Sequence, residues 1–163
     1  MLAFAIVNQA QFFRVALGIL VLTALAKLAS LGFANSQLLS YYDPLWEVQT
    51  RYVLGMVAAF ELGVGGILML SKNRILKCLV CSAAGAEFIL YRIFNYLSDS
   101  PRPCPCLGAL YDWIHINPRI FDGLLSGAAA FLFIGGMLYL FMESIGRLIQ
   151  PRPRWKKLER HNR

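Results

Sequence analysis

The chain has 163 residues, of which 58% are hydrophobic and only 15% are charged. Soluble domains carry about 25% charged residues, so this composition, with a mean hydropathy of +0.55, argues against a soluble domain and indicates an integral membrane protein. The formal net charge is +7, and residues 147–163 hold seven Lys or Arg against one Glu. Because a basic tail beside a membrane helix typically marks the cytoplasmic face, we expect no nucleic-acid partner.

Four apolar segments predict an all-α bundle of four transmembrane helices within residues 1–146, because a helix needs about 20 apolar residues to cross a bilayer. Residues 1–13 are mixed, and we expect them to lie at the membrane interface. Residues 147–163 are expected to form a separate basic cytoplasmic tail. The predicted spans are about 14–34, 51–70, 75–97 and 118–145.

Glycines recur in the second and fourth predicted spans, where small residues would let neighbouring helices approach closely. Asn117 and Pro118 suit the first turn of the fourth span, because Asn caps helices well and Pro is tolerated at the first helical position. The glycines expected on packed faces are Gly55, Gly63, Gly65, Gly66, Gly123, Gly127, Gly135 and Gly136.

The distribution of basic residues predicts the orientation of the bundle. Four spans place both termini on one side of the membrane. The turn at 71–74 and the tail together hold nine Lys or Arg, whereas the loops 35–50 and 98–117 hold only Arg102. Cytoplasmic loops carry an excess of basic residues, so both termini should be cytoplasmic. The 98–117 loop should then face the periplasm of a bacterial inner membrane.

Three prolines in five residues interrupt the apolar pattern and hold a Cys104-Pro105-Cys106 unit in that loop. A polyproline-like path rises about 3.1 Å per residue, so the two cysteine Cα atoms would lie about 6 Å apart, within the range of disulfides. The side chains of such a path diverge, which predicts a strained and therefore oxidising disulfide. Three interpretations stay open: a redox couple, a structural link, and a metal site for Cu(I) or Zn that includes His115.

A second cysteine pair, Cys78 and Cys81, lies within the third predicted span near its cytoplasmic end. The CxxC spacing is typical of redox centres with a low-pKa thiol. However, cysteines in membrane helices commonly serve as small packing residues, and the cytoplasmic side is reducing. We therefore interpret this pair as packing residues.

The charged residues inside the predicted spans are candidates for function, and four of them stand out: Lys27, Glu61, Glu87 and Arg92. Charges facing lipid are costly, so these side chains should point inward and pair. Lys27 and Glu61 are expected to pair with each other, and Glu87 and Arg92 to reach partners on other helices. Two interpretations remain: cohesion of the bundle, or a polar pocket for a quinone head group or for proton transfer.

Four short motifs occur together in the chain: Arg14 opening the first span, Ala26-Lys27-Leu28, Glu61-Leu62-x-x-Gly65 and Cys104-x-Cys106-x-Gly108. With these features the chain resembles the MauE/DoxX-like family of redox-associated four-helix membrane proteins. In the last motif, which is the most specific one, Leu107 precedes the glycine where the family often has an aromatic residue.

The resemblance implies periplasmic thiol–disulfide exchange, in which Cys104 and Cys106 help partner proteins form disulfides. The partner would be a periplasmic client or a thioredoxin-like protein, and the chain would be a thiol–disulfide oxidoreductase. Two alternatives remain: a non-catalytic subunit of a larger membrane complex whose Cys-Pro-Cys loop is a staple, and a metal-handling membrane protein.

Overall fold

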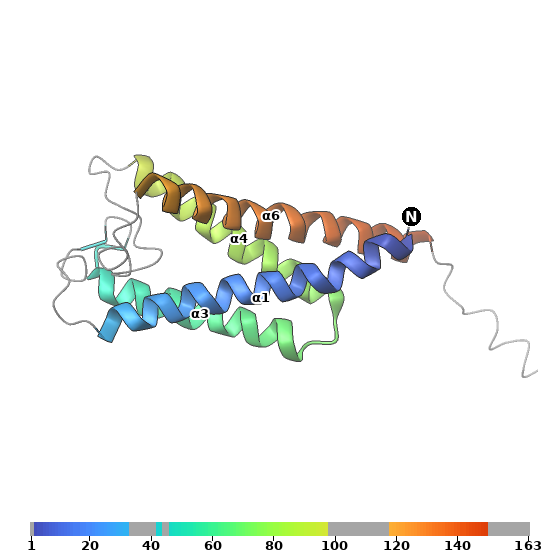
Figure 1. Cartoon of the computed structure of the whole chain (residues 1–163), viewed down its shortest axis with the longest axis horizontal. Helices are drawn as coiled ribbons and strands as arrows, with labels where there is room; N and C mark the ends of the chain where they lie inside the picture. Colours follow the sequence, from blue (N-terminus) through green and yellow to red (C-terminus); the bar gives the residue numbers. More distant parts are fainter. Residues whose placement is uncertain (1, 33–41, 44–45, 98–117, 150–163) are drawn as a thin grey trace, which may run out of the picture.

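The computed structural model describes residues 2–32, 42–43, 46–97 and 118–149, which contain four long α-helices (Figure 1). Consecutive helices run in opposite directions along the bundle. The prediction of an all-α fold with four helices is confirmed. The helices are α1 (Leu2–Gly32), α3 (Thr50–Leu70), α4 (Arg74–Leu97) and α6 (Pro118–Ile149).

Three of these helices contain stretches that are long and apolar enough to cross a membrane: Gln9–Gly32, Thr50–Leu70 and Asp122–Gly146. The chain is therefore a multi-pass membrane protein. α4 is not among the three, and it carries the charged residues Arg74, Lys77, Glu87 and Arg92. Its 24 residues extend about 36 Å at 1.5 Å per residue, which exceeds the thickness of a hydrocarbon core. A spanning α4 stays a prediction.

The first helix begins earlier than the sequence indicated. Residues 2–13 belong to α1, and Gln9 and Phe12 are buried inside the bundle. The expectation that residues 1–13 lie at the interface is therefore wrong from Gln9 onward. The physical reason is that Phe12 continues the buried stripe of Ala16 and Leu20 at helical spacing, so it packs on the other helices instead of lying on the surface.

Local signals explain where α4 and α6 begin. In the turn after α3, the Asn73 side-chain oxygen accepts a hydrogen bond from the Ile75 N–H at 3.1 Å, which caps α4. The Ser71 hydroxyl oxygen accepts one from the Asn73 N–H at 3.1 Å and closes the turn. α6 begins at Pro118, where a missing N–H costs nothing. The predicted cap Asn117 lies outside the described residues.

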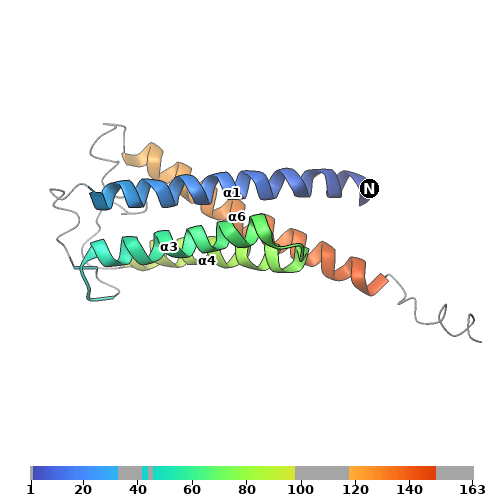
Figure 2. The same ribbon diagram turned by 90° about the horizontal axis from the view of Figure 1, so that it is seen from below.

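The helices pack as two pairs. α4 lies closely along α6 and α1 along α3, whereas the two pairs meet through fewer contacts. In Figure 2, α6 crosses α1 obliquely. The apolar core joins the pairs near the end of the bundle that holds the start of α1 (Figure 1). Its buried residues are Phe12, Ala16, Leu20, Val64, Leu68, Cys81, Ala84 and Leu132.

The opposite end of the bundle holds the end of α1, the start of α3, the end of α4 and the start of α6 (Figure 1). A short turn before α3 is fixed there by Asp43, which is only 2% exposed. Its carboxylate accepts hydrogen bonds from the Tyr91 hydroxyl of α4 at 2.7 Å and from the Trp46 N–H at 3.3 Å. Asp43 thereby ties this turn to α4.

Candidate functional site

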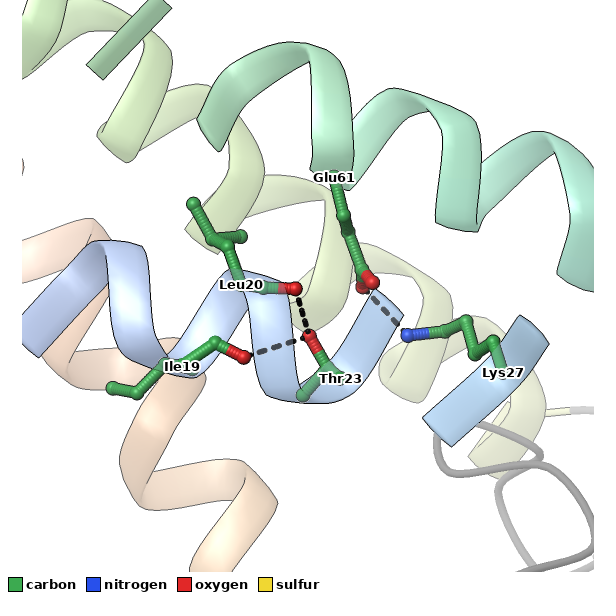
Figure 3. Close-up of polar contacts among 5 residues, drawn as sticks. All are labelled: Ile19, Leu20, Thr23, Lys27 and Glu61. Carbon is green, nitrogen blue, oxygen red and sulfur yellow. Dashed lines mark hydrogen bonds and ion pairs between the residues drawn. The ribbon is translucent and has the colours of Figure 1, made fainter. Parts of the chain in front are cut away.

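A buried ion pair joins α1 to α3 beside the apolar core (Figure 3). The Lys27 Nζ lies 2.6 Å from the Glu61 Oε1, and the two side chains are 2% and 1% exposed. Lys27 follows Leu20 and Ala24 on the buried stripe of α1, and Glu61 follows Ala58 on that of α3. The predicted pairing of Lys27 with Glu61 is confirmed.

The surroundings of this ion pair leave some of its hydrogen-bonding capacity unused. Thr23, one turn before Lys27, donates its hydroxyl proton along its own helix to the carbonyl oxygens of Ile19 and Leu20, at 3.0 and 3.1 Å (Figure 3). The Glu61 Oε2 is buried without a hydrogen-bond partner among the described residues. The Lys27 ammonium also lies 5.5 Å from the centre of the Phe88 ring, a favourable cation–π distance.

A second ion pair joins α4 to α6. Arg92 binds the carboxylate of Asp122 through its Nη2, while its Nη1 is buried and lacks a partner within the described part of the chain. The expectation that Arg92 reaches another helix is confirmed. Asp122 was not singled out from the sequence, although an acidic residue one turn into the fourth span was the available signal. Glu87 lies within electrostatic reach of both Lys27 and Glu61.

A small hollow lies between α1, α4 and α6, beside both ion pairs. Its volume is about 10 Å³, which is about what one water molecule requires. The wall is almost entirely apolar, although Lys27 and Arg92 are among the residues that line it. The lining residues are Ile19, Thr23, Lys27, Phe88, Arg92, Leu125 and Ala128.

The cysteines of α4 lie in the packed interior. Cys78 and Cys81 are free thiols with no exposed surface. The side-chain amide of Gln9 lies 4.0 Å from the Cys78 sulfur, which it can reach as a weak hydrogen-bond donor. A thiol exchanging with a partner must be accessible, so this geometry supports the interpretation of the pair as packing residues.

Comparison with protein families places these helices in a known group. The family model of the methylamine utilisation protein MauE matches residues 4–141, which is most of the chain. The chain belongs to the MauE family. The resemblance seen in the sequence is thereby confirmed. No curated protein and no solved structure gave a match.

The MauE match includes both ion pairs and the segment with the Cys-Pro-Cys unit, and it ends before the basic tail. Cys104, Cys106 and His115 lie outside the described residues, so their roles in this MauE-family chain stay predictions. Within the described ranges, no three His, Cys, Asp or Glu side chains gather into a group that could hold a metal ion.

Proposed function

We propose that this MauE-family protein carries out thiol–disulfide exchange at the periplasmic face of a bacterial inner membrane. Cys104 and Cys106 would form the exchanging pair and would help partner proteins form disulfides. Two findings support this function: the membership of the chain in the MauE family and the arrangement of the helix ends. The arrangement of the helix ends is the observation that carries the proposal.

The helix ends that flank the Cys-Pro-Cys segment lie opposite the basic turn. α4 ends and α6 begins at one end of the bundle, whereas Lys72 and Arg74 lie at the other, with the start of α1 and the end of α6 (Figure 1). Basic residues favour the cytoplasmic side, which supports cytoplasmic termini and a periplasmic position for Cys104 and Cys106. Disulfides form and persist in the periplasm.

The proposed reaction transfers a disulfide from this chain to its partner. A partner thiolate attacks one sulfur of the Cys104–Cys106 disulfide, forms a mixed disulfide and releases the other cysteine as a thiolate. The partner's second thiolate then attacks its own sulfur in the mixed disulfide. The products are an oxidised partner and a reduced Cys104/Cys106 pair, so each cycle leaves two electrons on this chain.

The alternative of a non-catalytic subunit would be favoured by an uncharged bundle interior. The interior contains instead the buried Lys27–Glu61 ion pair. An ion pair held away from water stabilises a bundle less than apolar packing does, so this pair argues against a purely structural role. The metal-handling alternative would depend on Cys104, Cys106 and His115, which lie outside the described residues.

Cysteine substitutions test the proposed exchange directly. In a Cys106→Ser variant, the Cys104 thiolate should attack the disulfide of an oxidised partner and release one partner thiolate. The mixed disulfide should then persist because Cys106 is absent, and it should appear as a slower band on a non-reducing gel that disappears on reduction. The Cys104→Ser variant should trap less if Cys104 is the attacked sulfur. Cys78→Ser is the matched control and should trap nothing, because it keeps both loop cysteines to resolve a mixed disulfide and removes only a buried thiol.

The same experiment can refute the proposal. If both single serine variants mature their client proteins normally, the relay function fails and the subunit alternative replaces it. If the Cys104–Cys106 bond resists reduction until the protein is denatured, the loop is a structural staple.

A further inference from the structure

We propose that the turn before α3 is the docking surface on which the exchange partner lies while its sulfur reacts with Cys104 or Cys106. The inference rests on the proposed function and deepens it, because it names the surface that recognises the partner and the chemistry of that partner. The described part of this turn comprises residues 42–43 and 46–49.

The turn presents large aromatic and apolar side chains outward. Trp46 is 58% exposed, Tyr42 is 64% exposed, and Val48 is exposed beside them. The Asp43 side chain is buried instead, where its carboxylate accepts the hydrogen bond from Tyr91 of α4. Trp and Tyr are the residue types that most often carry the binding energy of protein interfaces. The outer surface of the turn therefore has the composition of a binding site for another protein.

Backbone hydrogen bonds hold this surface in one conformation. The Asp43 N–H donates to the Val48 carbonyl oxygen at 2.7 Å, and the Glu47 N–H donates to the Asp43 carbonyl oxygen at 2.9 Å. Tyr42 and Gln49 form an antiparallel bridge across the base of the turn. A surface that is already fixed in this way loses little conformational entropy when a partner binds.

Glu47 gives the turn a strained backbone. Its φ is 51°, in the left-handed region that residues other than glycine rarely occupy. Such a conformation costs about 1–3 kcal/mol and persists only where the surrounding contacts impose it. An aromatic ring that only partitions into the lipid interface gains nothing from a fixed backbone, whereas a surface that binds a protein does. The strain therefore favours a protein over lipid as the occupant of this surface.

The turn lies at the end of the bundle where α4 ends and α6 begins (Figure 1). It is bonded to Tyr91, which precedes Leu97 at the end of α4 by six residues, or about 9 Å along the helix axis. Cys104 follows Leu97 by seven residues, and seven residues span at most about 25 Å. The covalent chain therefore limits how far the exchanging sulfur can lie from the turn.

This limit specifies the kind of partner that fits. A folded domain of about 100 residues has a radius of gyration of about 13 Å, so it is roughly 30 Å across. A domain of that width, bonded through sulfur to Cys104, is wide enough to cover the turn as well. To pack on Trp46 it needs an apolar surface on the face that carries its reactive cysteine. The partner is therefore a folded periplasmic protein with such a face.

A photoreactive residue at position 46 tests the contact in cells. p-Benzoylphenylalanine replaces Trp46 in the Cys106→Ser variant, whose mixed disulfide defines the partner. After illumination and full reduction, the same protein, identified by mass spectrometry, should remain attached through position 46. p-Benzoylphenylalanine in place of Phe141, an exposed aromatic residue toward the opposite end of the bundle, is the matched control and should retain none of it. Adducts with lipid alone, or equal retention from both positions, would show that Trp46 is a lipid-interface anchor and overturn the docking surface.

Truncation of the exposed ring provides the second measurement, in the Cys106→Ser protein in lipid nanodiscs. The Cys104 thiolate attacks the disulfide of the trapped protein, purified and oxidised, and releases one partner thiolate. Trp46→Ala should slow this step about tenfold or more, whereas Phe141→Ala should not change it. Oxidised glutathione is too small to contact the turn and Cys104 together, so it should react equally fast with both variants. Equal rates with the partner, or equal slowing with both disulfides, would overturn the docking surface.

The docking surface and the exchange function fail in different ways. If Cys106→Ser traps a partner but position 46 retains none of it, or Trp46→Ala reacts with it at an unchanged rate, the docking surface fails alone. If neither Cys106→Ser nor Cys104→Ser traps a partner, the exchange function fails and the docking surface fails with it.

Discussion

Lys27 and Glu61 illustrate that the partner of a buried charged residue can be predicted from the sequence. Each occupies a position at which helical spacing places the neighbouring apolar residues inside the bundle, and a lone charge there costs at least a few kcal/mol. The pair offsets part of that cost, because Nζ and Oε1 lie 2.6 Å apart. The Glu61 Oε2 has no hydrogen-bond partner among the described residues, so part of the cost remains.

Breaking this pair on one side should destabilise the protein strongly. Lys27→Met leaves Glu61 charged and buried, and the loss of one partner from a buried ion pair costs about 3–5 kcal/mol. The double variant Lys27→Met/Glu61→Leu should recover much of this loss, because no charge remains. Thermal unfolding in detergent, followed by circular dichroism, measures both effects.

Lys72→Met is the matched control for this series, since Lys72 is exposed in the turn between α3 and α4. It should change the melting temperature little. A Glu61→Gln variant could instead unfold at the same temperature as the unsubstituted protein and retain client oxidation. That result would show that the Lys27–Glu61 pair contributes no more than ordinary packing.

At the scale of helices, the close contact between α4 and α6 depends on glycines from both sides. A Cβ on Gly85 of α4 would overlap the backbone N of Phe133 and lie 2.9 Å from the Ala129 carbonyl oxygen. A Cβ on Gly136 of α6 would lie 3.0 Å from the Cys78 carbonyl oxygen. Two helix backbones can approach this closely only where a side chain is missing.

A single methyl group should therefore separate α4 from α6. The Cβ of Gly85→Ala would overlap backbone atoms of α6, which cannot move aside by a side-chain rotation. The substitution should therefore destabilise the bundle by roughly 1–3 kcal/mol. Gly127→Ala is the matched control, since its Cβ would have nothing within 4 Å. It should be neutral or stabilising by about 0.5–1 kcal/mol.

The melting temperatures of the two glycine variants in one detergent test this contrast. If Gly85→Ala and Gly127→Ala melt together, the backbone contact between α4 and α6 contributes nothing specific. Half of the glycines that the sequence placed on packed faces are not packed: a Cβ would have nothing within 4 Å at Gly63, Gly66, Gly123 and Gly127. The expectation holds for Gly55, Gly65, Gly135 and Gly136, where a Cβ would contact a neighbouring helix.

At the scale of the whole molecule, the antiparallel order of the helices decides which segments share a face of the membrane. The start of α1, the 71–73 turn and the end of α6 lie together, opposite the helix ends that flank residues 98–117 (Figure 1). The polar groups follow the same division, because the apolar core lies near the first end and the two ion pairs lie toward the second.

The proposed orientation predicts which cysteines are accessible from outside the cell. After mild reduction, a membrane-impermeant maleimide should label Cys104 and Cys106 in spheroplasts. A variant that lacks these two thiols is the control and should stay unlabelled until it is denatured, because Cys78 and Cys81 are buried. A cysteine introduced at Arg154 should react only after lysis. The reverse pattern would invert the orientation.

The sequence by itself determined the fold class, the family and the Lys27–Glu61 pair. Apolar length and helical spacing are local properties, and a buried charge demands a partner of opposite sign. The sequence could not determine that Arg92 pairs with Asp122, that Tyr91 holds Asp43, or where the hollow lies. Each of these depends on how helices distant in the chain are rotated and at what angle they cross. Those angles are set by backbone contacts such as those of Gly85 and Gly136, which exist only in the tertiary structure.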